Sequence, residues 1–492
     1  MVNAAKYREI QSNFVLNVPG ENLNHNNPVF LVDRIIHGFL SENSFLLPNK
    51  ETNRGRRKTY QTGELLGFIV WGVLNGITSC RGLENWLNNN DETCNYILNN
   101  KKPSKSTIAR FFNSNMFLIE ELFRYTVNLG IKYDLIGFEH VAIDGTILKA
   151  NVNKFRVIKM CEREYLENLI TEMEKDDDLL FKLEKYFLDD VLDENNHIII
   201  QEIKNESKKE VLNLLTKSLM SDEEKREVLD FIVYLKANYN GKNTISLTDP
   251  ESRWMKDKKG NTGLNYNYQV ATDDKYDFIV AQKLVNDPTD HHQFIPMSDE
   301  VKMNLNRHPT LYTADNGYLT DKTAEYCYQN NITTIMPDRT ESIKIKHQKP
   351  ENRFKKHNFQ YNWEEDVYIC PQNQILKYTN NRRINSKLYR VYSTKQCKNC
   401  IHSQECYKGI KREIFHTANP LKIKMSENYN SDLGRKTYRK RFHTGETYFA
   451  ILKNSRKFPG IQRKTIKKAQ TELTLQTIAH NIKIIHKHLK PH

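Results

Sequence analysis

The chain has 492 residues, of which 38% are hydrophobic and 27% charged, which is typical of a globular protein and unlike a disordered one. Its length exceeds what one compact core usually holds, so we expect two or three folding units. No segment approaches the ~20 apolar residues that span a bilayer, and the N-terminus carries no signal-peptide pattern. We therefore expect a cytoplasmic protein without a membrane partner. The net charge of +14 favours a polyanion as partner, although solubility alone would explain it equally well.

The first part of the chain, residues 1–135, is expected to consist of helices. Several short helices are predicted, and Ser104 or Ser106 is a candidate N-cap of the last of them. Lys105 and Arg110 flank that helix. They are compatible with a DNA-reading helix, and also with an exposed helix of a bundle.

Strand and helix signals alternate in the remainder of the chain. Strands are predicted at residues 140–146, 265–273, 276–285, 310–315 and 332–337, and a helix at residues 321–329. This order predicts an α/β domain with a mixed sheet flanked by helices over residues 136–492. Two insertions are expected in it, a charged helical one at residues 157–240 and a cysteine-bearing one at residues 340–425.

Two aspartates, Asp144 and Asp315, are predicted at strand ends, where ligand-binding side chains of open α/β sheets collect. Carboxylates on neighbouring strands can share Mg²⁺ or Mn²⁺ ions, and two such ions about 3.5–4 Å apart cleave phosphodiesters. Gly145 and Gly317 would let a substrate approach closely. Taken singly, each aspartate is equally consistent with the start of a turn.

A strongly basic segment follows near the C-terminus. Residues 434–468 contain twelve Lys or Arg and a single acidic residue, Glu446. One helix can carry Tyr438, Arg441, Glu446, Phe449 and Lys453 on one broad face, with Glu446 and Lys453 about 20° apart around the helix axis. Arg439 and Lys440 of the same helix are further candidate DNA contacts. Such a helix would present one carboxylate to a metal ion while its cations contact DNA phosphates.

Three segments together, AIDGT, YTADNGY and YRKRFHTGETYFAILK, resemble the bacterial insertion-sequence transposases of the Tyr-Arg-Glu-Lys signature branch. Shorter similarities lie in DPESRWM, in residues 267–269 and in AHNI. The resemblance implies an RNase H-like catalytic domain after an N-terminal helical DNA-binding region. It implies a Mg²⁺- or Mn²⁺-binding triad of Asp144, Asp315 and Glu446, with DNA positioned by Tyr438, Arg441 and Lys453. Its expected activity is cleavage of DNA at the element's terminal inverted repeats and strand transfer into target DNA, by a homodimer associated with the nucleoid.

The chain departs from the family pattern at two positions. Gly445 precedes the glutamate where an apolar helix former is usual, and Ala450 replaces a common glycine. An interior helix glycine costs about 1 kcal/mol relative to alanine. Two alternatives therefore stay open: a metal-dependent nuclease without strand transfer, and a non-catalytic DNA-binding relic.

Four cysteines, Cys370, Cys397, Cys400 and Cys406, form a Cys-x26-Cys-x2-Cys-x5-Cys pattern. Four thiolates could hold a structural Zn²⁺ ion tetrahedrally, with His402 or His416 as a substitute ligand. The irregular spacing is also consistent with free reduced cysteines.

Three other acidic residues lie near predicted strands: Asp249, Asp287 and Asp290, the last followed by His291 and His292. We interpret them as turn aspartates and surface histidines.

Overall fold

The computed structural model describes residues 23–24, 26–47, 59–152, 157–158, 245–246, 249, 251–257, 260–337, 353–362, 365–384, 387–417, 419–456 and 458–489. The predicted helical insertion at residues 157–240 lies outside these residues except for positions 157–158. No helix in the described part is long and apolar enough to cross a membrane.

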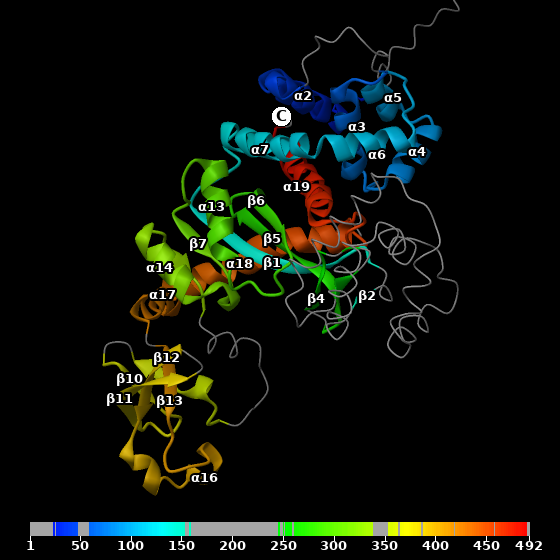
Figure 1. Cartoon of the computed structure of the whole chain (residues 1–492). Coiled ribbons are helices and arrows are strands. Elements are labelled where there is room, and N and C mark those ends of the chain that lie inside the picture. Colours follow the sequence, from blue (N-terminus) through cyan, green and yellow to red (C-terminus); the bar gives the residue numbers. More distant parts are fainter. Residues whose placement is uncertain are drawn as a thin grey trace, which may run out of the picture.

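The chain begins with a group of helices, seen at the top of Figure 1. They are α2 (Pro28–Glu42), α3 (Thr62–Leu74), α4 (Cys80–Asn88), α5 (Glu92–Leu98), α6 (Lys105–Ser114) and α7 (Met116–Lys132). Ser104 is the N-cap of α6, because its side chain accepts a hydrogen bond from the Thr107 backbone N–H at 3.3 Å. A buried apolar cluster runs without interruption from these helices into the sheet below them, so the two parts share one core.

The central sheet is mixed. Its strands are β1 (His140–Lys149), β4 (Arg253–Lys256), β5 (Thr262–Asp273), β6 (Phe278–Val285), β7 (Leu311–Thr313) and β8 (Thr334–Ile335). The order is β4-β5-β1-β7-β8, with β6 pairing β5. Strand β1 pairs antiparallel with β5 and parallel with β7, and β8 continues the parallel half.

Helices from several parts of the chain lie beside this sheet. They are α13 (Phe294–Leu305), α14 (Asp321–Gln329), α17 (Pro420–Asn430), α18 (Asp432–Ala450) and α19 (Ile466–His488). Helix α14 packs on α13 and α17. Helix α18 packs on β1 and β5, whereas α7, α13 and α19 pack on β6 (Figure 1). The Asn481 side chain of α19 accepts from the backbone N–H of Ile279 and donates to its carbonyl, which fixes the last helix to the edge of the sheet.

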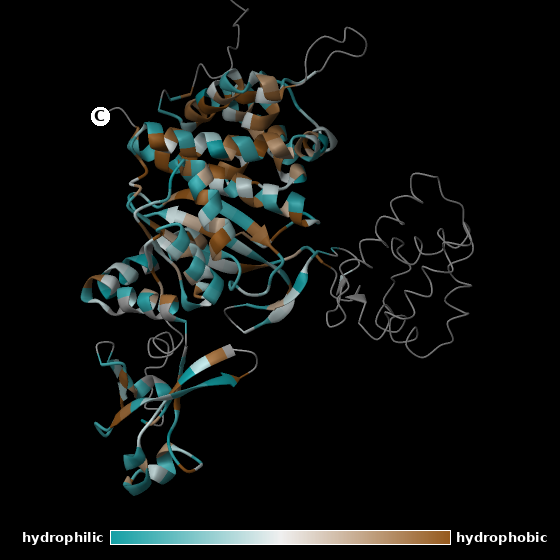
Figure 2. Cartoon of the chain, turned by 60° about the vertical axis from the view of Figure 1, so that its left-hand side comes forward, coloured by the Kyte–Doolittle hydropathy of each residue, from teal (hydrophilic) through white to brown (hydrophobic). Residues whose placement is uncertain are grey.

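A second, smaller sheet lies apart from the larger body in Figures 1 and 2. Its strands are β9 (Gln360–Asn362), β10 (Val367–Ile369), β11 (Ile375–Ile384), β12 (Lys387–Ser393) and β13 (Ile414–Thr417), with all neighbours antiparallel. A 3₁₀ turn, η5 (Lys395–Asn399), and helix α16 (Ser403–Cys406) follow β12. This five-stranded domain occupies the predicted cysteine-bearing insertion, between β8 and α17.

The buried histidine of α19, His480, makes the fold sensitive to acid. Its ring donates from Nε2 to the Asp277 carbonyl at 2.9 Å, and burial lowers its pKa to about 4. Because the folded-state pKa lies below the unfolded value of about 6.5, the stability it contributes is present above pH 6.5 and is lost as the pH falls toward 4.

Acidification from pH 8 to pH 5 is therefore expected to lower the free energy of unfolding by about 2 kcal/mol more in the wild type than in His480→Gln. Glutamine keeps an N–H donor but does not titrate. Urea unfolding of both proteins at the two pH values measures this difference. An equal decrease in the free energy of unfolding of both proteins would show that His480 does not cause the acid sensitivity.

Candidate active site

The two predicted aspartates follow the same point of two neighbouring strands. Ala142 of β1 is in register with Thr313 of β7, and Asp144 and Asp315 each come two residues after this pair. Sequence analysis placed Asp144 at a strand end, which is wrong: β1 continues to Lys149. It is β7 that stops at Thr313, and the side of β1 next to Asp144 therefore lacks a neighbouring strand where Asp315 begins its turn.

Asp144 is buried and forms an ion pair with Arg441 of α18. The Arg441 Nη2 atom donates to Asp144 Oδ1 at 3.0 Å, and each side chain is 6% exposed. Burial alone would lower the pKa of Arg441, but the negative charge of Asp144, together with Tyr438, Asp315 and Tyr318, holds that pKa above its usual value. Arg441 is therefore a permanent cation at this carboxylate.

Tyr438 completes this contact one helical turn earlier. Its hydroxyl accepts from Arg441 Nη1 at 3.3 Å, and its ring packs edge-on against Tyr429 of α17 at 5.1 Å between centroids. Burial raises the pKa of Tyr438 to about 12, so it stays a neutral phenol. The signature tyrosine thus holds Arg441 in place and is 5% exposed, which leaves it little surface for direct contact with DNA.

Gly445 lies where α18 approaches β1. A Cβ atom at this position would lie 3.4 Å from Asp144 Cβ and 3.9 Å from Ala142 Cβ, within ordinary van der Waals contact. The glycine therefore sits on the helix face that packs on the strand. An alanine would fit there without a clash, so the contact does not by itself demand glycine.

The structure places Glu446 differently from the expectation. We expected it to share a broad helix face with Tyr438, Arg441 and Phe449, but those three are buried whereas Glu446 is exposed. Lys453 is also exposed, and it lies beyond α18 on a π-helical turn, Ile451–Ser455. The wider π turn alters the angular relation that a continuous α-helix would give.

Lys453 nevertheless reaches the strand that carries Asp144. Its Nζ atom donates to Thr146 Oγ1 at 2.6 Å. Successive strand residues alternate between faces, so Thr146 and Asp144 point to the same side of β1. The structure therefore brings Arg441 and Lys453 to the same face of β1 as Asp144.

Asp315 caps the turn that follows β7. Its Oδ1 atom accepts from the Gly317 backbone N–H at 2.7 Å, which leaves the side chain half-buried at the start of η3 (Asn316–Tyr318). Tyr318 at the end of this turn is fully buried. Burial, and then the negative charges of Asp290, Asp144 and Asp315, raise the pKa of Tyr318 well above its usual value.

Sequence reasoning missed the position of Asp290. Its Oδ1 atom accepts from Asn267 Nδ2 at 2.8 Å and from Gln269 Nε2 at 2.7 Å, and Gln269 in turn accepts from the Tyr318 hydroxyl. A Cβ at Gly317 would lie 3.5 Å from Asp290 Cβ. Asp290 is thus beside the Asp315 turn, on the side of β1 that Gly145 faces. In the sequence Asp290 was singled out only as a turn aspartate near a predicted strand, and the similarity noted at residues 267–269 was the only signal for its partners.

The other predicted DNA contacts fall into two places. Arg439 and Lys440 are exposed on α18, the helix that carries Arg441. Lys105 and Arg110 are exposed on α6, which belongs to the upper helices of Figure 1 rather than to the sheet. The structure therefore does not join the α6 pair to the α18 cations in one cluster.

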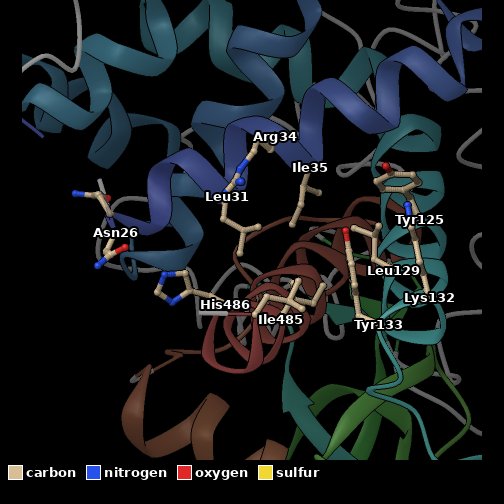
Figure 3. Close-up of a pocket in the computed structure, with 12 residues that line it drawn as sticks. Asn26, Leu31, Arg34, Ile35, Tyr125, Leu129, Lys132, Tyr133, Ile485 and His486 are labelled. Atoms are coloured by element: carbon tan, nitrogen blue, oxygen red, sulfur yellow. The ribbon is translucent and has the colours of Figure 1, made fainter. Parts of the chain in front are cut away.

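A cavity of about 640 Å³ lies elsewhere, between α2, α7 and α19 (Figure 3). Leu31, Leu129 and Ile485 give it apolar walls, and Arg34 and Lys132 lie at its edge. None of the residues predicted to cleave or bind DNA lines it, so it is not the candidate active site.

The donor chemistry at Asp144 and Asp315 suits a hard divalent cation, because both groups supply carboxylate oxygens. The positions of the side chains do not yet form a full set of metal ligands. In the described part of the chain no three Cys, His, Asp or Glu side chains are close enough together to hold a metal ion. Arg441 supplies the positive charge at Asp144 Oδ1 in this arrangement.

Comparison with known families bears on this site. The model of a family described as transposase DDE domain matches residues 369–486, which confirms the resemblance to DDE transposases in that part of the chain. The matched part contains α18 with Arg441 and Glu446, but neither Asp144 nor Asp315. The match supports a transposase, a family that acts on DNA and generally uses divalent metal ions. No curated protein and no solved structure matches the chain.

Proposed function

We propose that the protein is a DNA transposase that binds the inverted repeats of its element, cleaves the strands there and joins them to target DNA. The proposal rests mainly on how the structure arranges Asp144, Asp315 and Arg441. One carboxylate lies on β1 and the other two residues beyond the end of the adjacent parallel strand β7, and the arginine of the family-matched helix is bonded to the first of them.

The order of the sheet supports an RNase H-like domain. Three antiparallel strands, β6, β5 and β1, are followed by β7 and β8 in parallel, with α13 and α14 between the later strands. This is the arrangement that the resemblance implies, with the first aspartate on the central strand and the second after the next strand.

Mg²⁺ or Mn²⁺ is the cofactor proposed for this site, held by Asp144, Asp315 and Glu446. Such ions would supply an activated water and stabilise the leaving oxygen. Glu446 is exposed one residue beyond Gly445, on the helix that packs against Asp144. Arg439, Lys440 and Lys453 would contact phosphates. A homodimer is proposed because two element ends must be joined.

Strand cleavage and strand transfer should be measured with DNA carrying the inverted repeats that flank the gene, in Mg²⁺, in Mn²⁺ and with chelator. The wild type is expected to cleave and join only with metal. Glu446→Gln should cleave at least about tenfold more slowly, while Glu325→Gln, at an exposed glutamate of α14, should behave as the wild type.

Three results would point elsewhere. Cleavage without joining of pre-cut ends indicates a nuclease. DNA binding without cleavage by any protein indicates a non-catalytic relic. Equal cleavage by Glu446→Gln and the wild type would show that the protein cleaves DNA but that Glu446 is not one of its metal ligands.

A further inference from the structure

The five-stranded domain, residues 353–417, has a small apolar core. The buried cluster described at its centre consists of Phe359, Tyr368, Leu376, Tyr392 and Ile414, and the half-buried Cys370 and Cys406 pack against it. The described cysteines of the chain are all free, so none of them links this domain by a disulfide. A unit of this size commonly depends on a covalent or metal cross-link in addition to its core.

The turn between β10 and β11 directs two backbone donors at one sulfur. The N–H groups of Gln372 and Gln374 each lie 3.3 Å from Cys370 Sγ. The turn is closed by the Asn373 N–H, which donates to the Cys370 carbonyl at 2.8 Å, with Asn373 in the left-handed region at φ 56°. Donors placed in this way stabilise the negative charge of a thiolate, which is the form that binds metal ions.

Cys397 and Cys400 lie one 3₁₀ turn apart, and the Cys400 N–H donates to the Cys397 carbonyl at 3.4 Å. Side chains three residues apart on such a turn lie above one another, so the two thiols share one side of it. The Tyr407 hydroxyl donates to the same Cys397 carbonyl at 2.9 Å, which ties the turn to the end of α16.

Cys406 brings the two groups of thiols together. It is the last residue of α16 and packs against the same apolar cluster as Cys370. Burial raises the pKa of its thiol, and the nearby thiols of Cys397, Cys370 and Cys400 add to that rise. All four sulfurs, from two segments separated by the whole of β11 and β12, therefore lie in one neighbourhood.

We propose that Cys370, Cys397, Cys400 and Cys406 bind one Zn²⁺ ion as four thiolates, which joins the β10–β11 turn to the η5–α16 segment. As free thiols the four are near one another without three of them meeting at metal-binding distance. Zn–S bonds of about 2.3 Å would draw the sulfurs closer, and both segments that carry them are short turns at the end of the domain. The site stabilises the fold and takes no part in the proposed DNA chemistry.

The test is the metal content of the full-length protein, purified without chelator and measured by mass spectrometry of the elements. About one zinc per chain is expected. Cys400→Ser should lose most of it, whereas Cys327→Ser should retain it, because Cys327 is a buried free thiol of α14 in the larger body. No DNA is needed, so the outcome is independent of the transposase proposal.

Cobalt substitution covers the case in which Cys400→Ser misfolds. Wild-type protein stripped of metal and refilled with Co²⁺ should show the intense visible absorption of a tetrahedral thiolate complex, and zinc should displace it. Wild-type protein that contains no zinc and gives no such spectrum overturns the proposal. Iron in place of zinc in the isolated protein overturns the assignment of the metal.

Discussion

Replacement of Arg441 by methionine is expected to lower the free energy of unfolding by about 3–5 kcal/mol. The guanidinium is buried against Asp144 and Tyr438, and methionine keeps much of the length of the side chain while removing its charge and donors. Loss of one partner of a buried ion pair leaves the other charge in a poorly solvated place, which is why the expected cost exceeds that of an ordinary surface change. Urea denaturation of the full-length protein measures it.

Arg439→Met is the matched control, because Arg439 is exposed on the same helix, and its effect should stay within about 0.5 kcal/mol. The double variant Asp144→Asn/Arg441→Met should be less destabilised than the sum of the two single variants, since both charges are then gone. Additive effects would mean that the two side chains are not coupled in solution.

Asp315→Asn is expected to reduce DNA cleavage by more than about 100-fold with little change in folding. Asparagine keeps the oxygen that accepts the Gly317 N–H, so the turn persists, but the negative charge is lost. Outer-shell partners of metal ligands contribute about 10–100-fold, and a proposed direct ligand should contribute more. Rates of strand cleavage in saturating Mg²⁺ provide the measurement.

Asp321→Asn serves as the comparison for this variant. Asp321 is an exposed aspartate six residues later, at the start of α14, and its replacement should leave cleavage within about twofold of the wild type. Cleavage by Asp315→Asn at a rate near that of the wild type would show that Asp315 is not a metal ligand in the reaction. That conclusion would hold whether or not Asp144 is one.

Much of the central sheet was predictable, because its strands are continuous apolar segments bounded by turns. Asp144 and Asp315 stood out because each interrupts or ends such a segment. Their exact setting was not predictable: Asp144 lies inside a long strand, whereas Asp315 lies two residues beyond the end of the neighbouring strand, which stops at Thr313. The length of a neighbouring strand is a tertiary property that no local pattern encodes.

The basic helix was predictable as an element but not in its orientation. Spacing alone grouped Glu446 with Arg441, whereas packing on β1 selects the face that carries Gly445 and leaves Glu446 exposed. Asp290 was interpreted only as a turn aspartate because its neighbours, Gln269 and the turn at Tyr318, come from separate parts of the chain. A single aspartate in a loop has no periodicity from which such a position could be inferred.

The pairing of Asp144 with Arg441 joins residues 297 positions apart in the sequence. A ribosome must therefore translate beyond residue 441 before the two halves of this site can meet, and a chain released earlier carries the first aspartate without the helix that covers it. Contacts of such long separation also form late in folding, because the intervening chain must be closed into a loop first. Truncated and half-folded copies consequently lack the assembled site, and only a finished chain possesses it.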